Sequence, residues 1–354
     1  MSKATTQSQT GLLNKPKDTM KIYNDFDSKY TKCNYLNGGT YGKVYKCCKK
    51  GEDKTEYAVK IQEASFDDNS YVRTLTEAKI WNTLEHKNIV KLYECFLQAD
   101  QFYFVMELVP GDNLFDEILR KSTHTESNTC LYIKQILSAL AYLHVNKIIH
   151  RDVKPDNIML YQDTQKGSSS VVKLVDFGLA RRLDNGKNRM ECAPSGAPLY
   201  LAPETIMEVA LGSPVDVWSC GVIMYILLYG SPPFWSEDTN KLFLAIIGSD
   251  VDFTCTDERE PVSFLANDLV QEMLVKDQND RITASEALEH PWISQPRGLK
   301  LSREHRRSTV ERLSKFRRST SVFELQQRFN GMKMEGSLTG DRARNGRYLD
   351  VPVS

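Results

Sequence analysis

The sequence predicts an α+β fold with two lobes, the first rich in β-strands and the second mainly α-helical. Short β-branched and aromatic runs separated by turn residues fill residues 30–107. Beyond the Pro110–Gly111 turn, apolar residues recur at helical spacing instead. A chain of 354 residues has room for one large two-lobed unit or a few small domains. The change of pattern at residues 107–112 favours two lobes joined at that point.

The first lobe is expected to contain several strands and one helix. The strands are short runs that partly alternate between apolar and polar residues, at Val44–Cys47, Tyr57–Ile61, Leu92–Phe96 and Phe102–Glu107. The helix is expected at about Val72–Leu84, where apolar residues recur at near-helical spacing. Residues 1–29 are polar and are expected to form a disordered N-terminal extension.

The second lobe is expected to be built from helices. Their apolar patterns lie at Leu114–Leu119, Cys130–His144, Pro214–Tyr229, Thr239–Ile247, Phe264–Leu274 and Thr283–His290. The longest apolar run, Val217–Tyr229, is too short to span a bilayer, which takes roughly 20 residues, and predicts a buried core helix. The sequence also carries no secretory signal, no myristoylation glycine and no prenylation motif, so no membrane anchor is expected.

Charge is distributed unevenly along the chain. The 46 Lys and Arg residues balance the 46 Asp and Glu residues. Residues 297–347, however, hold 14 basic and 5 acidic residues, a net charge of +9, which leaves residues 1–296 near −8. No further feature favours nucleic-acid binding, so the basic tail points to an acidic protein partner. The eight cysteines are scattered without a C-x-x-C pair, which argues against a zinc site and a disulfide framework.

A glycine-rich turn, Leu36-Asn-Gly-Gly-Thr-Tyr-Gly-Lys-Val44, connects two expected strands. Glycine lets backbone N–H groups approach phosphate oxygens, although a plain flexible hairpin would look the same. Lys60 ends the following Tyr57-Ala-Val-Lys60 strand, and Glu77 on the expected helix is its candidate partner. In isolation these two residues would be a surface lysine and a solvated carboxylate.

The strongest signal is Ile149-His-Arg-Asp-Val-Lys-Pro-Asp-Asn157, followed by Val175-Asp-Phe-Gly178. Phosphoryl transfer needs a carboxylate to orient a hydroxyl, oxygen ligands for Mg²⁺ and cations to balance the charge on the transferred phosphate. Asp152, Asn157, Asp176, Lys154 and Lys60 provide these groups. One carboxylate and one amide oxygen are enough protein ligands for Mg²⁺ when phosphates and water complete the shell.

The order of these motifs, together with Ala202-Pro-Glu204, resembles the protein-kinase catalytic domain from about residue 30 to 293. Residues 87–96, 113–118 and 287–293 resemble calcium/calmodulin-dependent and calcium-dependent protein kinases in particular. The resemblance implies a kinase domain over 30–293, with an N-lobe at 30–109, a C-lobe at 110–293 and a regulatory tail at 294–354. Lys154 within the HRDxKPxN motif is the form found in serine/threonine kinases.

The resemblance also implies roles for individual residues, with ATP and Mg²⁺ as cofactors. Asp152 would be the catalytic base, Lys154 would stabilise the γ-phosphate, and Asn157 and Asp176 would bind Mg²⁺. Lys60, paired with Glu77, would bind the α- and β-phosphates, and Glu204 would pair with Arg281 while Asp216 anchors the catalytic loop. The remaining nucleotide contacts would come from Leu36, Gly39, Gly42, Val44, Ala58, Met106, Glu107 and Val109.

Several positions depart from the family pattern. Asn37 replaces the first loop glycine, and the turn is expected to survive because asparagine tolerates left-handed backbone. Ala197 replaces a threonine whose hydroxyl would bond the catalytic Asp and Lys, a loss worth roughly 1.5–3 kcal/mol. Ala193 occupies the usual phosphorylation position, so activity without loop phosphorylation is expected, with Glu191 as the nearest fixed negative charge to Arg151.

Substrate preference is expected to be a loose Arg-x-x-Ser/Thr pattern. Asn113 replaces the glutamate that commonly reads arginine at position −3, while Asp112 and Asp156 remain nearby. Ile226 replaces the acid that reads position −2, and by family analogy Leu179 after the DFG motif favours serine over threonine. The protein substrates themselves cannot be named from these residues.

The tail contains a basic amphipathic segment at about residues 305–333. Phe316, Phe323 and Phe329 have the 1-8-14 spacing of calmodulin targets, and basic residues lie between them. Calmodulin or a similar acidic calcium sensor is therefore an expected partner. Because the segment follows the kinase-like region directly, the resemblance also implies that it is autoinhibitory. Alternatives are a helix that merely packs on the C-lobe or one that lies on a membrane surface. Arg-x-x-Ser/Thr-like sites at residues 306–309 and 317–321 suggest regulatory autophosphorylation.

The sequence thus predicts a serine/threonine protein kinase, autoinhibited by its tail and relieved by calcium–calmodulin, at a cytoplasmic location with nuclear access left open. Two alternatives remain. One is a catalytically impaired kinase-like scaffold, suggested by Ala197 and Asn37, and the other is a calcium-independent kinase with a packing helix. No calcium-binding loop is visible, so the chain would rely on a separate sensor or be a fragment of a longer calcium-dependent kinase.

Overall fold

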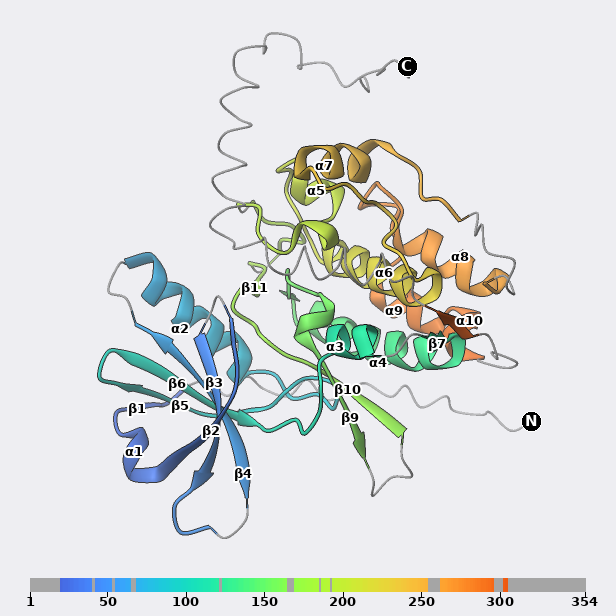
Figure 1. Ribbon diagram of the computed structural model, residues 1–354. Coiled ribbons are helices and arrows are strands. Elements are labelled where there is room, and N and C mark those ends of the chain that lie inside the picture. Colours follow the sequence, from blue (N-terminus) through green and yellow to red (C-terminus); the bar gives the residue numbers. More distant parts are fainter. Residues whose placement is uncertain are drawn as a thin grey trace, which may run out of the picture. The chain divides into compact units, whose positions relative to one another are not determined.

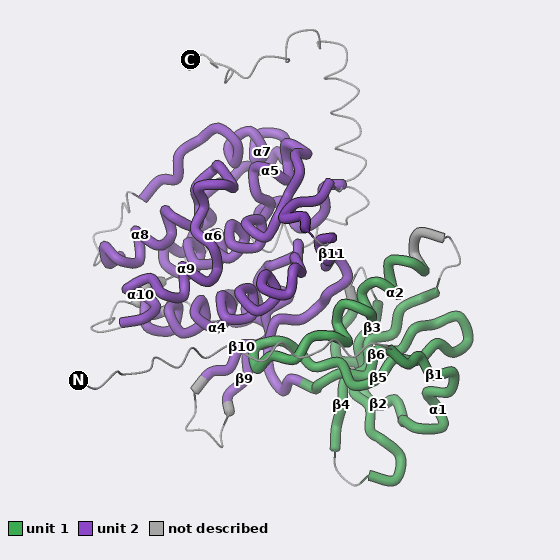
Figure 2. Tube along the Cα trace, turned by 180° about the vertical axis from the view of Figure 1, so that it is seen from behind, with its two compact units in different colours: residues 1–108 green, residues 109–354 purple. Residues whose placement is uncertain are grey.

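The chain divides into two compact units, residues 1–108 (unit 1) and 109–354 (unit 2) (Figure 2). The division lies one residue from the lobe boundary expected from the sequence. The computed structural model describes residues 20–39, 42–52, 55–64, 68–120, 123–163, 169–184, 186–191, 193–253, 262–295 and 302–304. Each unit is described on its own below.

Unit 1 is built on a six-stranded sheet with the order β1-β5-β6-β4-β3-β2 (Figure 1). Its strands are β1 (Ile22–Tyr23), β2 (Tyr30–Gly39), β3 (Gly42–Lys49), β4 (Glu56–Glu63), β5 (Leu92–Gln98) and β6 (Gln101–Glu107). Only the β1–β5 pair in this sheet is parallel. The four strands expected from the alternating pattern are confirmed, each slightly longer than its apolar run.

One long helix, α2 (Asp68–Asn82), packs on this sheet through its aromatic residue Trp81. The Trp81 ring lies 6.1 Å from that of Phe104 on β6, and its Nε1 donates a hydrogen bond to the Val90 carbonyl at 2.8 Å. The helix begins earlier than the apolar pattern indicated, but it confirms the expected helix. Its attachment to the sheet fixes the position of Glu77 on unit 1.

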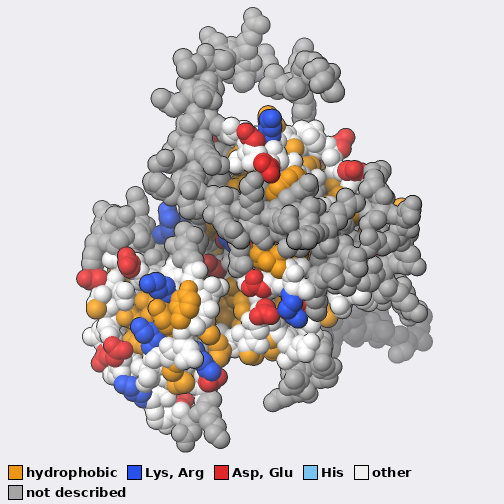
Figure 3. Space-filling view, in the orientation of Figure 1, with side chains coloured by type: hydrophobic (Ala, Val, Ile, Leu, Met, Phe, Trp, Pro, Cys, Tyr) orange, Lys and Arg blue, Asp and Glu red, His pale blue; other side chains and the backbone are white. Residues whose placement is uncertain are grey.

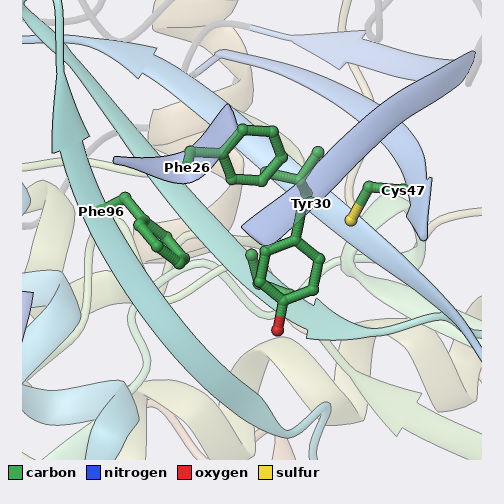
Figure 4. Packing of buried hydrophobic residues seen from close by; sticks show 6 residues of the cluster. Phe26, Tyr30, Cys47 and Phe96 are labelled. Atoms are coloured by element: carbon green, nitrogen blue, oxygen red, sulfur yellow. The ribbon is translucent and has the colours of Figure 1, made fainter. Parts of the chain in front are cut away.

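The N-terminal extension expected to be disordered, residues 1–29, is shorter than predicted. Residues 20–29 are described, and they form β1 and the short helix α1 (Phe26–Lys29). Phe26 is buried in a core cluster with Tyr30, Cys47 and Phe96 (Figure 4), which also contains Val59 and Val105. Phe26, an apolar residue within a polar stretch, therefore holds this segment on the sheet. Of the expected extension, only residues 1–19 lie outside the described residues.

The helices of unit 2 surround one fully buried helix, α6 (Pro214–Tyr229). The other helices of eight or more residues are α4 (Glu126–Val145), α7 (Thr239–Gly248) and α8 (Phe264–Met273). A Cβ on Gly221 of α6 would lie 2.9 Å from the Met273 Cβ, so α6 and α8 pack with little space between them. Every helix expected from the apolar pattern is present, and α6 confirms that the longest apolar run is a core helix.

Shorter elements complete unit 2 and position its loops. The helical ones are α3 (Leu114–Arg120), η1 (Pro155–Asn157), η3 (Pro198–Tyr200), α5 (Pro203–Ile206), α9 (Ala284–Glu289) and α10 (Pro291–Ser294). The strands are β7 (Thr123–Thr125), β8 (Ile148–Ile149), β9 (Ile158–Asp163), β10 (Ser169–Leu174), β11 (Arg181–Arg182) and β12 (Ser302–Glu304). They form three two-stranded sheets, β9–β10, β8–β11 and β7–β12.

Within the described residues, no helix combines the length and apolar character needed to cross a membrane. On the face of unit 1 shown in Figure 3, basic and acidic side chains are interspersed among hydrophobic ones. The basic segment at about residues 305–333 lies outside the described residues, so its expected helix is not tested by the fold.

Replacing Phe26 by alanine is expected to destabilise unit 1 by about 3–5 kcal/mol, because the substitution leaves a cavity among buried aromatic rings. Urea unfolding monitored by near-ultraviolet circular dichroism measures this loss. The control is Tyr23→Ala on the neighbouring strand, where the residue is 43% exposed and the loss of stability should be clearly smaller. Equal losses in both variants would contradict a structural role specific to Phe26.

Candidate active site

The glycine-rich turn of unit 1 is the hairpin between β2 and β3. The two strands remain paired up to Gly39 and Gly42, and residues 40 and 41 lie outside the described chain. Gly42 has a φ of 131°, and a Cβ at this position would clash with the Ile61 carbonyl oxygen. The position therefore requires glycine, because it combines a backbone conformation that favours glycine with a close approach of β3 to β4.

Asn37 is accommodated for a different reason from the one expected. It lies in β2 opposite Val44 and is not among the described residues with positive φ. Its side-chain oxygen accepts a hydrogen bond from the Gly38 N–H at 2.8 Å. The hairpin therefore does not need left-handed backbone at this position, and Asn37 still pairs with Val44 although the ladder shifts register between Tyr35 and Asn37.

In unit 1, strand pairing places several of the residues expected to contact the nucleotide opposite one another. In the β3–β4 ladder Val44 lies opposite Lys60, and in the β4–β6 ladder Ala58 lies opposite Met106. Glu107 follows at the end of β6, and Leu36 lies in β2, where its side chain is exposed. Val109 is the first residue of unit 2.

The ion pair expected between Lys60 and Glu77 is present. Lys60 Nζ lies 2.8 Å from Glu77 Oε1, and both side chains are buried, at 8% and 3% exposure. Gln62 Nε2 donates a second hydrogen bond to Glu77 at 3.3 Å. Gln62 was not expected from the sequence, although it follows Lys60 by two positions and therefore points to the same face of β4. The arrangement fixes an ammonium group on β4, as phosphate binding requires.

The candidate catalytic loop of unit 2 connects β8 to β9. Lys154 Nζ lies 2.8 Å from Asp152 Oδ2, and Asn157 Nδ2 donates to the same oxygen at 2.9 Å. A second hydrogen bond of 2.9 Å from Asn157 Nδ2 to the Asp152 carbonyl closes the loop. The structure therefore brings together three residues that the sequence assigned to catalysis.

The charge state of Lys154 is favourable for binding phosphate. Burial lowers the pKa of this lysine, but the carboxylates of Asp152, Asp156 and Asp176 outweigh burial and hold its pKa above the ordinary value. Lys154 therefore remains cationic at neutral pH. The Asp152 oxygen that receives two hydrogen bonds is oriented, and its second oxygen is available to accept a proton.

Asp176 follows β10 and lies beside the catalytic loop. The Val175 N–H donates to the Asn157 carbonyl at 3.0 Å, and His150 Nε2 lies 3.2 Å from the Val175 carbonyl oxygen. These contacts hold Asp176 and Asn157 on adjacent segments. A carboxylate and an amide oxygen are suitable Mg²⁺ ligands when nucleotide phosphates supply the rest of the shell. Among the described residues there is no cluster of three or more His, Cys, Asp or Glu that would bind a metal alone.

Asp216 on α6 anchors the catalytic loop, as the family resemblance implied. Its carboxylate accepts hydrogen bonds from the backbone N–H groups of His150 and Arg151 at 2.9 and 2.8 Å. His144 Nε2 on α4 lies 2.9 Å from the same carboxylate. Burial raises the pKa of Asp216, but His144 and the backbone donors outweigh burial and hold it below the ordinary value. The involvement of His144 had no signal in the sequence.

Arg151 donates hydrogen bonds to several neutral acceptors. Its guanidinium donates to Ser195 Oγ at 2.6 Å, to the Ala193 carbonyl at 2.9 Å and to the Leu179 carbonyl at 3.4 Å. The Ser195 hydroxyl therefore accepts a hydrogen bond from Arg151, and among the described contacts it does not bond Asp152 or Lys154 as the missing threonine hydroxyl would. A small cavity lies beside Ala197, lined by Asp152, Tyr200 and neighbouring residues.

The residues expected to contact the substrate differ in exposure, and some of them form hydrogen bonds or ion pairs within unit 2. Asn113 caps α3, accepting a hydrogen bond from the Asp116 N–H and donating one to the Asp116 carboxylate, both at 2.8 Å. Asp112 is 63% exposed and lies 3.9 Å from Arg120. Ile226 is fully buried in α6, so its side chain offers no surface for reading position −2. Asp116, which bonds Asn113, is a further acidic residue at this place.

Fold and site together define a protein kinase domain, with a glycine-rich hairpin, a Lys–Glu pair, a catalytic loop and a DFG segment. The protein kinase domain model matches residues 30–293, and the chain belongs to that family. It is also similar to the rabbit (Oryctolagus cuniculus) calcium/calmodulin-dependent protein kinase type II subunit delta, with 39% identity over 292 residues. The alignment covers 82% of this chain and 54% of that protein, so the chain spans about half the length of this curated relative.

The expected structural ion pair between Glu204 and Arg281 is also present. Two hydrogen bonds of 2.6 and 2.9 Å join the two side chains, which are almost completely buried. The guanidinium further donates to the carbonyls of Val275 and Pro214 and lies 5.0 Å from the centre of the Trp218 ring. The pair therefore connects α5 to the start of α6 and to the loop before α9.

Glu204→Gln is expected to destabilise unit 2 by about 3–5 kcal/mol, because it leaves the buried guanidinium without a compensating charge. Chemical denaturation measures the effect. The control is Asp184→Asn, which removes one partner of the exposed pair with Lys187 at 3.7 Å and should change stability little. If Glu204→Gln proved as mild as this control, the ion pair would not be a structural requirement.

Proposed function

We propose that the protein is an ATP- and Mg²⁺-dependent kinase that phosphorylates serine and threonine residues of proteins. The observation that carries the proposal is the hydrogen-bonded set of Asp152, Lys154 and Asn157 in the catalytic loop. The Lys60–Glu77 pair in unit 1 supports it. The serine/threonine preference is inferred from Lys154 in the HRDxKPxN motif and from the rabbit relative.

Asp152 orients the substrate hydroxyl and accepts its proton as the new bond to phosphorus forms. Its carboxylate is held by Lys154 and Asn157, so little reorganisation is needed when the hydroxyl arrives. Lys154, kept cationic by the surrounding carboxylates, balances negative charge on the transferred group. Lys60 binds the non-transferred phosphates. Asn157 and Asp176 would hold Mg²⁺, which neutralises phosphate charge when bound.

The bonding of Arg151 supports activity that does not depend on phosphorylation of the activation segment. In kinases that need a loop phosphate, the corresponding arginine commonly binds that phosphate. Here Arg151 already donates to Ser195 and to two carbonyls of unit 2. The segment carrying Ala193 and Ser195 is therefore held near the catalytic loop by hydrogen bonds to uncharged groups.

The alternative of a catalytically impaired scaffold rests on Ala197. Without the threonine hydroxyl, Asp152 and Lys154 lose a shared hydrogen-bond partner, a deficit that would reduce turnover roughly tens- to a hundredfold. Lys154 and Asp152 nevertheless bond each other directly at 2.8 Å. This contact favours the active kinase over the scaffold.

The purified chain is expected to transfer phosphate from Mg²⁺–ATP to a basic peptide containing Arg-x-x-Ser. The variant Asp152→Asn should lower kcat by about 10²–10⁴-fold, because it removes the catalytic base. Radiolabel transfer and single-turnover kinetics measure this. Asp100→Asn, in an exposed turn of unit 1, is the matched control and should keep full activity. Nucleotide binding without transfer in the wild-type chain would favour the scaffold. A peptide series lacking Arg at position −3 tests the substrate preference.

We propose further that the segment at about residues 305–333 inhibits the kinase and binds calcium–calmodulin. The charge pattern of the tail, the spacing of its phenylalanines and the similarity to the rabbit calcium/calmodulin-dependent kinase support this proposal. β12 pairs with β7 immediately before the segment, so the chain leading into it is attached to unit 2. Phosphate at the Arg-x-x-Ser/Thr-like sites would reduce the positive charge and weaken binding to an acidic partner.

Calcium–calmodulin is expected to bind the full chain and to raise its peptide-kinase activity. In the double variant Phe316→Asp/Phe323→Asp the affinity for calmodulin should fall at least tenfold, because two apolar anchors are removed. Isothermal titration and activity assays measure the two effects. Val353→Asp, beyond the basic segment, is the control and should behave as wild type. Activity independent of calcium–calmodulin, with no binding, would favour a packing helix. Binding to anionic vesicles instead would favour a membrane-surface helix.

A further inference from the structure

Cys33 and Cys48 lie next to each other on the outer face of unit 1. Their sulfur atoms are 3.8 Å apart, although 15 positions separate them in the sequence. Cys33 is exposed and Cys48 is half-buried. A disulfide bond is about 2.05 Å long, so the two sulfur atoms would have to approach further, through side-chain rotation and an adjustment of the strands.

The local register explains how the two thiols meet. Thr31 of β2 pairs with Cys48 of β3, so these two residues share a face of the sheet, and Cys33 follows Thr31 by two positions. The ladder then shifts register between Lys32 and Tyr35, so the strand pairing is irregular next to Cys33. Cys47, one position before Cys48, points to the opposite face and is buried in the core.

The other cysteines of the described chain are poor candidates for oxidation. Burial raises the pKa of the thiols of Cys47 and Cys95 to about 12 and that of Cys130 to about 11. Cys220 is completely buried in α6, and burial raises the pKa of its thiol as well. Cys192 and Cys255 lie outside the described residues. Within the described chain, Cys33 thus has both a thiol neighbour and access to solvent.

We propose that Cys33 and Cys48 form a reversible redox site that links β2 to β3 through a disulfide when a low-molecular-weight disulfide is present. The Cys33 thiolate attacks one sulfur of the small disulfide, forms a mixed disulfide and releases one small thiolate. The Cys48 thiolate then attacks the Cys33 sulfur and releases the second small thiolate. In total two protein thiols are oxidised, one small disulfide is reduced, and the two protons pass to the small thiolates.

Exposure determines the order of the two steps. Cys33 is accessible to an incoming reagent, whereas burial and the neighbouring Cys33 raise the pKa of the Cys48 thiol. Cys48 therefore acts second. By then the mixed disulfide on Cys33 lies beside it, and this proximity compensates for a thiol that loses its proton less readily. Lys46 lies two positions before Cys48 on the same face and is paired with Glu56, so a cation is close to both sulfurs.

The link would close a loop that contains the whole tip of the glycine-rich hairpin. Residues 34–47 lie between the two cysteines, and the tip is at Gly39 and Gly42. A cross-link across two strands restricts the open conformations of such a loop. The oxidised form is therefore expected to have a hairpin that opens less often than the reduced form, whether or not the protein transfers phosphate.

The test uses the full reduced chain, equilibrated anaerobically with glutathione buffers of increasing disulfide content, alkylated and mapped by mass spectrometry. The expected result is joint loss of the Cys33 and Cys48 alkylation sites and a Cys33–Cys48 cross-linked peptide that reductant reverses. Cys48→Ser should instead retain glutathione on Cys33, because no second thiol displaces it. Stable glutathione on Cys33 in the wild-type chain, or cross-links only to Cys192, Cys255 or a second chain, would overturn the proposal.

Hydrogen exchange of the β2 and β3 amides gives a second readout. Oxidised wild-type protein is expected to exchange these amides several-fold more slowly than reduced protein. The double variant Cys33→Ser/Cys48→Ser should exchange at the same rate in oxidising and reducing buffers, which controls for the reagents. Equal rates in oxidised and reduced wild-type protein would contradict a link across the hairpin.

Discussion

The catalytic loop depends on one buried carboxylate, that of Asp216. Arg151 has a φ of 69°, a conformation that costs a non-glycine residue roughly 1–3 kcal/mol unless the surroundings impose it. The two backbone hydrogen bonds to Asp216 impose it, and they place Asp152 directly after the constrained residue. Almost all of α6 is buried, and His144 Nε2 lies 2.9 Å from the same carboxylate, so contacts on several sides hold it. The arrangement of Asp152, Lys154 and Asn157 therefore depends on a residue in the core of unit 2.

The departures from the family pattern have local explanations of two kinds. Asn37 is accommodated because the hairpin is extended at that position, so the replaced glycine was not needed for backbone freedom. Ala197 is different, because no described side chain replaces the missing hydroxyl and the nearby Ser195 hydroxyl is bonded to Arg151. The first replacement leaves the architecture intact, whereas the second remains the main chemical difference at the site.

Long periodic patterns were predictable from the sequence, whereas short elements were not. In the helices α4 and α6 and in the strands β4 and β6, the apolar pattern is long enough to predict the element from the sequence. Strands of two or three residues, such as β8 and β11, have no period and form only because tertiary contacts bring their partners together. The same holds within the site. Asp152, Lys154, Asn157 and Asp176 follow from motifs, but His144 meets Asp216 across 72 positions, and only the folded chain shows this contact.

The position of Phe26 has a consequence for the limits of the folding unit. The family match begins at residue 30, yet the core of unit 1 includes an aromatic ring four positions earlier. The Phe26 N–H also donates to the Gln98 side chain at 2.6 Å, which ties the segment to the end of β5. A recombinant fragment cut at the family boundary would expose Phe96 and Tyr103, against which Phe26 packs. The family-model match is thus shorter than the part of the chain that packs into the core of unit 1.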